Sequence, residues 1–178
     1  MTEEHYQIYS TGSIQIQCTC KTPDHTPKAV LFIVHGLGEH QGRYTEMADK
    51  FIENDIAVFT FDHRGHGKSD DKRGHADSIE QLVEDCEHAM MKCRSLFLDM
   101  PFFLFGQSMG GLVVAAYLDA MKSKEVSGAI ISSPWIGLVD PPASWKINLV
   151  KRLSGIFPSI TLPNGLDPVH ISSVTEEV

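Results

Sequence analysis

Three continuous apolar runs, separated by segments of helix length, constrain the fold of this chain more than any other feature. The runs are Ala29–Val34 (AVLFIV), Ile56–Phe61 (IAVFTF) and Pro101–Gly106 (PFFLFG), and Val126–Pro134 (VSGAIISSP) adds a fourth. Uninterrupted runs of this length are typical of strands that are buried on both faces. Because such strands alternate here with predicted helices, we expect an α/β fold: a mostly parallel sheet with flanking helices and right-handed crossovers.

Apolar residues at helical spacing mark the segments between the runs. Tyr44–Asn54 places its apolar residues on one face, and Met109–Met121 is a second predicted helix. Another helix is predicted to begin after Ser78, because Ser-Ile-Glu-Gln at 78–81 is typical of a capping box. Ahead of the first run, Ser13–Cys20 (SIQIQCTC) alternates apolar and polar residues, which predicts a half-exposed strand.

Charge and composition argue against several classes of protein. The net charge is −8 and the sequence has no run of Lys or Arg, so no nucleic-acid partner is expected. The apolar runs are too short to span a bilayer, and the acidic start lacks the apolar segment of a secretory signal. The four cysteines, Cys18, Cys20, Cys86 and Cys93, are therefore expected to be reduced thiols of a cytoplasmic protein. They show no C-x-x-C spacing, so no metal site is expected from them.

The segment FLFGQSMGG, from Phe103 to Gly111, predicts a nucleophile on a tight turn. Ser108 stands two residues from a glycine on each side, after a predicted strand and before a predicted helix. This strand–turn–helix setting is the one that the G-x-S-x-G motif requires. We expect a side chain at Gly106 or Gly110 to collide with its neighbours, and Gly111 to let the helix approach the sheet.

A second glycine-rich segment, HGLGEH at 35–40, follows the first apolar run at the place where an oxyanion donor is expected. Gly36 and Gly38 leave the backbone free to turn its N–H groups toward a substrate. The predicted oxyanion donors are the backbone N–H groups of Leu37 and of Met109, the residue after the nucleophile. Taken alone, His35–Gly36 would indicate no more than a turn at the end of a strand.

The segments VHGLGEHQGRY, FDHRGHGKSD and FLFGQSMGG, in this order, resemble the monoacylglycerol lipase and lysophospholipase branch of the α/β-hydrolase superfamily, of the serine aminopeptidase S33 type. The resemblance covers Ala29 to about Pro134 well and is weaker afterwards, where the chain resembles the start of that family's lid. It implies an α/β-hydrolase fold in which 1–134 form the N-terminal part of the core and 135–178 begin the lid. Gln107 departs from the histidine usual in the family, and we expect this change to tune the turn.

The resemblance also assigns roles to individual residues. Glu39 and Arg43 match positions that lie near the polar head of the bound ester; the alternative is a pair of surface loop charges. In the DHRGHGKS loop, Asp62 and His63 are expected to satisfy backbone groups. His63, His66 and His75 could suggest a metal site, but they lie on a loop without third-ligand spacing. No metal and no cofactor is therefore expected.

The acid and histidine that would complete a triad are not evident in this sequence. In this fold the order is nucleophile, acid, histidine, and only His170 follows Ser108, with Asp140 and Asp167 between them. No predicted strand precedes any of the three. We therefore expect the true acid and histidine to lie beyond Val178 in a longer chain, and this chain alone to be nearly inactive. A shortened core would also leave an apolar sheet edge uncovered. The end of the sequence also fits a frayed polar tail.

The function implied by the resemblance is that of a serine carboxylester hydrolase, like monoacylglycerol lipase, which cleaves fatty-acyl esters of glycerol or lysophospholipids through an acyl-enzyme on Ser108. One alternative is a non-catalytic hydrolase-fold protein that binds a lipid or a partner; another is an acyltransferase or peptidase on the same scaffold. Trp145–Phe157 predicts an amphipathic helix. This helix would either begin a lid that makes peripheral contact with a membrane, or pack on the core.

Overall fold

The computed structural model describes residues 1–122, 126–137 and 148. The chain divides into two units, Met1–Ile136 and Gly137–Val178, and the fold described below is that of the first unit. The predicted helix Trp145–Phe157 lies almost wholly outside the described residues, as do Asp140, Asp167 and His170.

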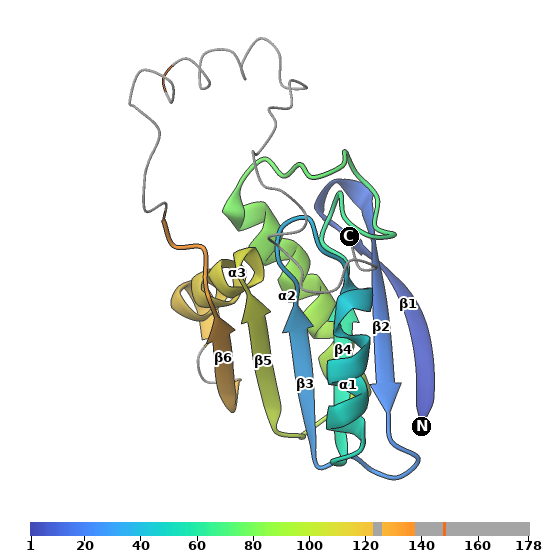
Figure 1. Cartoon of the computed structure of the whole chain (residues 1–178). Coiled ribbons are helices and arrows are strands. Elements are labelled where there is room, and N and C mark those ends of the chain that lie inside the picture. Colours follow the sequence, from blue (N-terminus) through green and yellow to red (C-terminus); the bar gives the residue numbers. More distant parts are fainter. Residues whose placement is uncertain (123–125, 138–147, 149–178) are drawn as a thin grey trace. The chain divides into compact units, whose positions relative to one another are not determined.

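The described residues form one mixed sheet with the strand order β1-β2-β4-β3-β5-β6 (Figure 1). Its strands are β1 (Thr2–Ser10), β2 (Ile14–Thr22), β3 (Ala29–Val34), β4 (Ile56–Phe61), β5 (Phe102–Gln107) and β6 (Gly128–Ser132). The pairs β3–β4, β3–β5 and β5–β6 are parallel, whereas β1–β2 and β2–β4 are antiparallel. The predicted α/β class with a mostly parallel sheet is confirmed, and the edge strand β1 is one that the sequence analysis did not predict.

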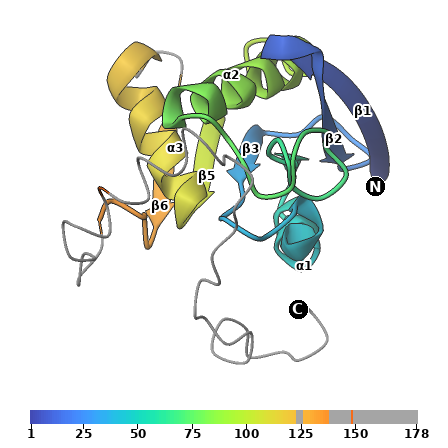
Figure 2. The same ribbon diagram turned by 90° about the horizontal axis from the view of Figure 1, so that it is seen from above.

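Helices cover the two faces of this sheet. They are α1 (Thr45–Ile52), α2 (Ile79–Leu96) and α3 (Met109–Tyr117), with short turns η1 (Thr11–Ser13) and η2 (Gln41–Tyr44) and a π-helical turn η3 (Leu118–Lys122). Viewed from above, α1 lies on one face and α2 and α3 lie on the other (Figure 2). The N-cap of α2 is Ser78, whose hydroxyl accepts the Gln81 N–H, as the capping box predicts. In the described part of the chain, no helix is both long enough and apolar enough to cross a membrane.

The core has one layer on each face of β3 and β4. On the α2 and α3 face, Phe32 stacks on Phe59 with ring centroids 5.6 Å apart, and both rings are fully buried. On the α1 face, Leu31, Ile33 and Val58 pack beneath the helix. These two strands are therefore buried on both faces, which confirms the prediction from their continuous apolar sequences.

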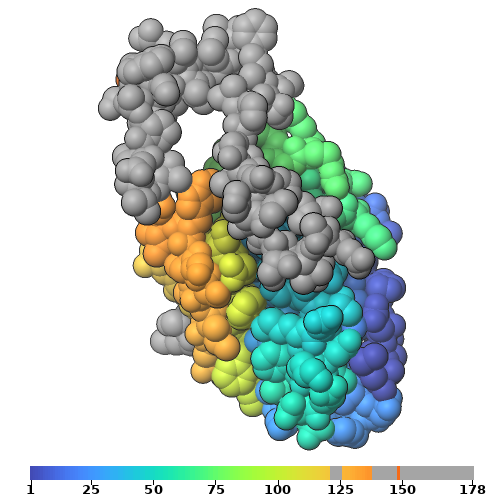
Figure 3. Space-filling view, in the orientation of Figure 1, coloured from blue at the N-terminus to red at the C-terminus, as the bar shows by residue number. Residues whose placement is uncertain are grey.

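The strands β5 and β6 differ from that prediction on the side of the sheet that carries α1. Phe103 on β5 is 37% exposed and Ile130 on β6 is 55% exposed. The reason is the path of α1, which follows β3, returns to β4 and packs over the β4 side of the sheet. The space-filling view shows β5 and β6 reaching the surface beside α1 (Figure 3). The expectation of full burial is therefore wrong for both strands on the α1 side. It is also wrong for β6 on the opposite side, where Ile131 is 39% exposed.

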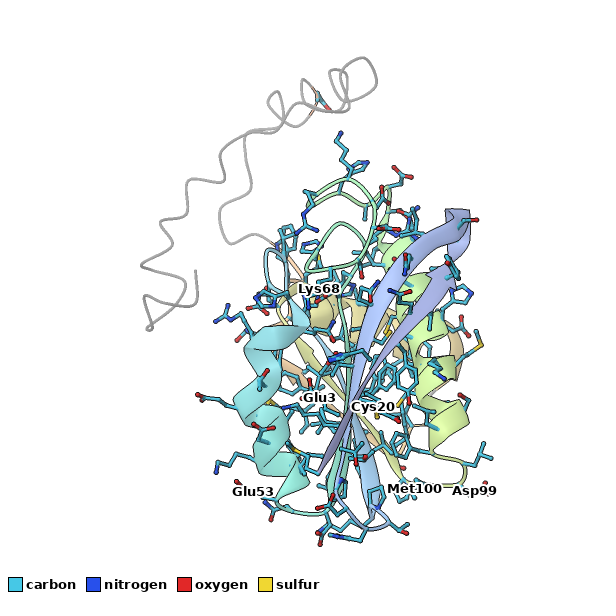
Figure 4. All side chains as sticks on the ribbon, turned by 90° about the vertical axis from the view of Figure 1, so that its right-hand side faces the viewer. Glu3, Cys20, Glu53, Lys68, Asp99 and Met100 are labelled. Carbon is cyan, nitrogen blue, oxygen red and sulfur yellow. The ribbon has the colours of Figure 1, made fainter. Side chains whose placement is uncertain are left out.

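A buried ion pair ties the long loop between β4 and α2 to the helix. Nε of Arg64 donates to one carboxylate oxygen of Asp85 at 2.6 Å, and Nη2 donates to the other at 2.7 Å. The side chains are 2% and 0% exposed, and the hydrogen bonds to Asp85 raise the pKa of Arg64. The view from the β1 edge shows Lys68 of this loop at the opposite end of the sheet from Glu53 and Met100 (Figure 4). The loop therefore lies at the end where β3, β4 and β5 end, which is the end that holds Ser108.

Candidate active site

Ser108 occupies a strained turn between β5 and α3. Its backbone has φ 52° and ψ −115°, and residues other than glycine rarely adopt such a positive φ. Three backbone hydrogen bonds hold the turn: the Ser108 N–H donates to the Ser132 carbonyl at 3.0 Å, and the Ser108 carbonyl accepts the N–H groups of Leu112 and Trp135, each at 3.1 Å. The predicted strand–turn–helix geometry is therefore present, and β6 with the residues after it fixes the turn.

The glycines around this turn have no room for a side chain. A Cβ atom on Gly106 would lie 2.5 Å from the Gly110 carbonyl oxygen, and one on Gly110 would lie 2.1 Å from the Val34 carbonyl oxygen. Both distances are far below van der Waals contact and both involve backbone atoms that cannot swing away. At Gly111 the corresponding distance is 3.2 Å, to the Gly106 oxygen. The collisions expected at Gly106 and Gly110 are thus confirmed, as is the close approach of the helix to the sheet.

The glycine-rich loop after β3 lies directly beside the serine. A Cβ atom on Gly36 would be 3.3 Å from the Ser108 Cβ. Among residues 1–122 and 126–137, no hydrogen-bond acceptor lies on the Leu37 N–H, and no side chain bonds the Ser108 hydroxyl. The Met109 N–H is the first of α3, and the first N–H groups of a helix have no partner within it. The two predicted oxyanion donors and the serine are thus brought to one end of the sheet, on adjacent strands.

Glu39 and Arg43 form a partly buried network at the base of this loop. Nη1 of Arg43 donates to Oε1 of Glu39 at 2.8 Å. Oε2 of Glu39 accepts the Tyr44 hydroxyl at 2.8 Å and the Gly36 N–H at 3.0 Å. Burial, with this bond to Glu39, raises the pKa of Tyr44. The Glu39 and Arg43 side chains are 16% and 26% exposed, so they are not simply solvated loop charges; their predicted contact with substrate stays a prediction.

Two buried histidines lie behind the loop, and both are held in the neutral form. Burial lowers the pKa of His35 to about 4 and lowers that of His63 well below its usual value. His63 bonds the carbonyl of His35, and the neighbouring Asp62 carboxylate accepts the backbone N–H groups of Gln41 and Lys68, each at 2.8 Å. The expectation that Asp62 and His63 satisfy backbone groups is therefore confirmed.

The other two candidate metal ligands, His66 and His75, each lie beside an oxygen of the protein. Nδ1 of His66 donates to the Arg64 carbonyl, and Nε2 of His75 lies 3.3 Å from Asp77. Within the residues that the structure describes, no three His, Cys, Asp or Glu side chains are arranged to hold a metal ion.

All four cysteines are buried free thiols. Burial raises the pKa of each thiol, that of Cys20 to about 12. A thiol with so high a pKa is protonated at neutral pH and is a poor nucleophile. The cysteines therefore act as small apolar core residues.

A cavity of about 410 Å³ lies away from the serine, between the β1–β2 pair and α1. Its walls include Lys21, His40, Thr60 and Asp62 but not Ser108. Lys21 is bound by Asp49 at 2.6 Å, and Asp62 is already occupied by backbone donors. Lys21 and Asp62 therefore already have partners within the protein.

Two contacts at the site were not predicted from the sequence. The Trp135 N–H donates to the Ser108 carbonyl, and the Tyr44 hydroxyl donates to Glu39. A backbone contact between segments 27 residues apart leaves no mark on residue type. The Tyr44 contact could have been sought, because Glu39 lies just before the turn η2 and Tyr44 is the last residue of that turn.

Known proteins resemble this chain along most of its length. A family model described as serine aminopeptidase, S33 matches residues 25–178. The monoacylglycerol lipase of Mycolicibacterium smegmatis is 32% identical over 177 residues, which cover 99% of this chain and 62% of the relative. The mouse monoglyceride lipase is 35% identical over 147 residues, which cover 82% of this chain and 48% of the relative. The chain thus spans about half to three fifths of the length of these relatives.

Solved structures resemble the fold in the same way. The crystal structure of the Paleococcus ferrophilus monoacylglycerol lipase matches with a TM-score of 0.65 and 32% identity, over 94% of this chain and 57% of that one. A soluble variant of the Saccharomyces cerevisiae monoglyceride lipase matches with a TM-score of 0.73 and 25% identity, over 94% and 56% of the two chains. The arrangement of strands, serine turn and glycine loop, together with the family match, shows that this chain belongs to the serine aminopeptidase S33 family of α/β-hydrolases.

Proposed function

We propose that this chain carries the nucleophile and the oxyanion donors of a serine carboxylester hydrolase. Its substrates would be fatty-acyl esters of glycerol or lysophospholipids, as the names of the related monoacylglycerol lipases suggest. The single observation that carries the proposal is the strained Ser108 turn lying against the glycine loop of Gly36. In this proposal, 1–134 belong to the hydrolase core and 135–178 begin a lid that meets the lipid.

The reaction begins with attack of the Ser108 hydroxyl oxygen on the ester carbonyl carbon. A histidine takes the hydroxyl proton, and the carbonyl oxygen becomes an oxyanion that accepts the N–H groups of Leu37 and Met109. Collapse of this intermediate breaks the ester C–O bond, and the histidine returns the proton to the leaving alcohol. Water then attacks the acyl-enzyme and releases the fatty acid. The histidine and its acid come from outside residues 1–137.

The energetics of the oxyanion depend on two donors and one helix. Loss of one such donor costs about 3 kcal/mol of transition-state stabilisation, or two to three powers of ten in rate. The Met109 N–H is at the N-terminus of α3, where the aligned peptide dipoles favour negative charge. Leu37 is 51% exposed, so a substrate can approach this residue from solvent.

Glu39 and Arg43 would orient the polar head of the ester. One N–H of the Arg43 guanidinium donates to Glu39, and a guanidinium has five such groups. The rest of the fork could donate to the hydroxyl groups of a glycerol head, while Glu39 holds the fork in place.

Labelling by a fluorophosphonate probe tests the proposal in the full-length protein. Wild-type protein and Ser95→Ala are expected to label and to hydrolyse a monoacylglycerol, because Ser95 lies on the exposed side of α2 and its hydroxyl only caps the Lys92 carbonyl. Ser108→Ala is expected to lose both signals. Labelling of a folded Ser108→Ala protein would show that the nucleophile is wrong.

Failure of the wild-type protein to label, with its fold intact, would instead favour a non-catalytic lipid- or partner-binding protein. Substrate class is decided by comparing a monoacylglycerol, a lysophospholipid and an aminoacyl amide under the same conditions. Faster cleavage of the amide would favour a peptidase on this scaffold.

A further inference from the structure

We propose that His35 is a positioning residue of the oxyanion hole, whose neutral imidazole fixes the Gly36–Leu37 peptide so that the Leu37 N–H faces the reacting ester. The inference rests on the proposed function, because it assumes that the Leu37 N–H is an oxyanion donor. It assigns a task to a buried side chain that does not itself touch the substrate.

The hydrogen bonds of His35 define which ring nitrogen carries the proton. The His63 backbone N–H lies 3.0 Å from Nε2 of His35, and a backbone N–H can only donate. Nε2 is therefore an acceptor without a hydrogen. A neutral imidazole has one N–H, so in His35 it must be on Nδ1. Nδ1 lies 2.7 Å from the Gly36 carbonyl oxygen, so the ring donates to that carbonyl.

The bonded carbonyl belongs to the same peptide group as the Leu37 N–H. The described part of the chain has no cis peptide bond, so the C=O and N–H of this group point in opposite directions. The Gly36 oxygen also accepts the Glu39 backbone N–H, but at 3.4 Å against 2.7 Å for His35. The shorter bond, from the His35 ring, therefore does most to set the direction of the Leu37 N–H, away from the ring. The preceding peptide is fixed as well, because the Gly36 N–H donates to Glu39 at 3.0 Å.

The His35 ring is itself immobile. It is fully buried, and the His63 ring meets it edge-on with centroids 4.5 Å apart. Nε2 of His63 donates back to the His35 carbonyl at 3.2 Å, so the two residues exchange one hydrogen bond in each direction. A Cβ on Gly110 would lie 2.5 Å from that same carbonyl oxygen. The ring, the glycine loop and the first turn of α3 therefore form one rigid unit beside the serine.

Three full-length variants separate positioning from plain structural support. His35→Asn places a side-chain N–H near the position of the imidazole Nδ1–H, so it can still bond the Gly36 carbonyl. His35→Leu fills similar space without a donor. His25→Asn is the matched control, because the His25 side chain is 63% exposed and pairs with Asp55.

We expect His35→Leu to lose about 100-fold in kcat and in the rate of fluorophosphonate labelling, with little change in KM, since the lost interaction acts on the transition state. His35→Asn should recover most of this loss, and His25→Asn should match wild type. A folded His35→Leu that labels and turns over at the wild-type rate would contradict the inference while leaving Ser108 as the nucleophile.

Nitrogen NMR of the imidazoles gives a readout that does not depend on activity. At pH 7 we expect His35 to show a proton on Nδ1 and none on Nε2. A proton on Nε2, or a charged ring, would refute the inference whether or not Ser108 is a nucleophile. If His35→Leu does not fold, these spectra and the kinetics of His35→Asn still decide, because a folded His35→Asn without recovered kcat would also count against it. Wild-type protein that does not label at all would refute the proposed function instead.

Discussion

Gly110 lies so close to the Val34 carbonyl that a Cβ atom on residue 110 would be 2.1 Å from its oxygen. Gly110 belongs to the first turn of α3, and Val34 is the last residue of β3. Their contact therefore sets the distance between the helix that follows the serine and the strand that precedes the glycine loop. An added Cβ could be accommodated only by moving the backbone of β3 or of α3.

The contact predicts a large loss of stability for Gly110→Ala. A methyl group there must push α3 away from β3, and overpacking of this kind costs about 3 kcal/mol or more when backbone has to move. Urea unfolding followed by circular dichroism measures the loss. The control is Gly137→Ala, because an added Cβ at Gly137 has no described atom within 4 Å, and it should change stability by less than about 0.5 kcal/mol. Equal stabilities of the two variants would show that the contact does not exist in solution.

The buried pair of Arg64 and Asp85 predicts a second strong effect. In Asp85→Ala the Arg64 guanidinium stays buried without its main carboxylate, which typically costs 3–5 kcal/mol. The exposed pair of Lys50 and Glu53 gives the control, since its side chains are 74% and 61% exposed and Glu53→Gln should cost under about 1 kcal/mol. Thermal and chemical unfolding of both variants measure the contrast. A loss no larger than that of the control would mean that Arg64 finds another partner or reaches water.

The two buried histidines predict that stability falls with acid. Burial lowers the pKa of His35 from 6.5 to about 4 and lowers that of His63 well below 6.5, so below pH 6.5 the unfolded chain binds protons that the folded chain does not. The stability that they contribute is complete above pH 6.5 and declines as the pH falls toward 4. For His35 alone the decline amounts to roughly 3 kcal/mol.

Unfolding free energies at pH 7, 6 and 5 measure this slope. The charged and titratable groups that face His35 are His63, His66, Asp62 and Glu39, and His35→Asn leaves all four in place. The variant should therefore show a shallower slope than wild type. Identical slopes would mean that His35 is protonated in the folded protein or neutral in the unfolded one.

The sequence predicted the parts of this fold that depend on residue type. The apolar runs of β3 and β4 are buried on both faces, and the glycines of the serine turn are required by backbone contacts. The run containing Phe103 gave the same expectation, but burial there depends on which helix packs over β5, and residue type does not encode that. The strand β1 was missed because its sequence, TEEHYQIYS, is mostly polar and exposed and lacks the continuous apolar run of β3 and β4, while the backbone pairing with β2 that defines it depends little on residue type.

In the site, too, the features that depend on residue type could be predicted, and those that depend on tertiary contacts could not. Ser108, Gly106 and Gly110 are recognisable because the turn tolerates few residue types at these positions. The exchange of hydrogen bonds between His35 and His63 was not predicted, since one partner in each bond is a backbone group. Such contacts become visible only when the strands β3 and β4 are placed side by side.

Glu39→Gln gives the last prediction and separates two roles of this residue. The carboxylate accepts donors from Gly36, Arg43 and Tyr44, and an amide replaces one acceptor oxygen with a group that can only donate. At least one of the three donors then loses its partner. A hydrogen bond to a charged group is worth about 1.5–3 kcal/mol, so we expect a loss of roughly 10- to 100-fold in kcat/KM if the glycine loop shifts.

Comparing two esters shows where that loss arises. A monoacylglycerol has a polar head that Glu39 and Arg43 would bind, and a simple alkyl ester of the same fatty acid does not. We expect Glu39→Gln to slow both, because the loop that holds the Leu37 N–H serves every ester, and to slow the monoacylglycerol more. Tyr44→Phe removes one of the two donors on Oε2 of Glu39 but leaves the carboxylate and its bond from the Gly36 N–H, so it should cost only a few-fold with either ester. Loss confined to the monoacylglycerol would assign Glu39 to the head group alone, whereas wild-type rates with both esters would remove it from the site.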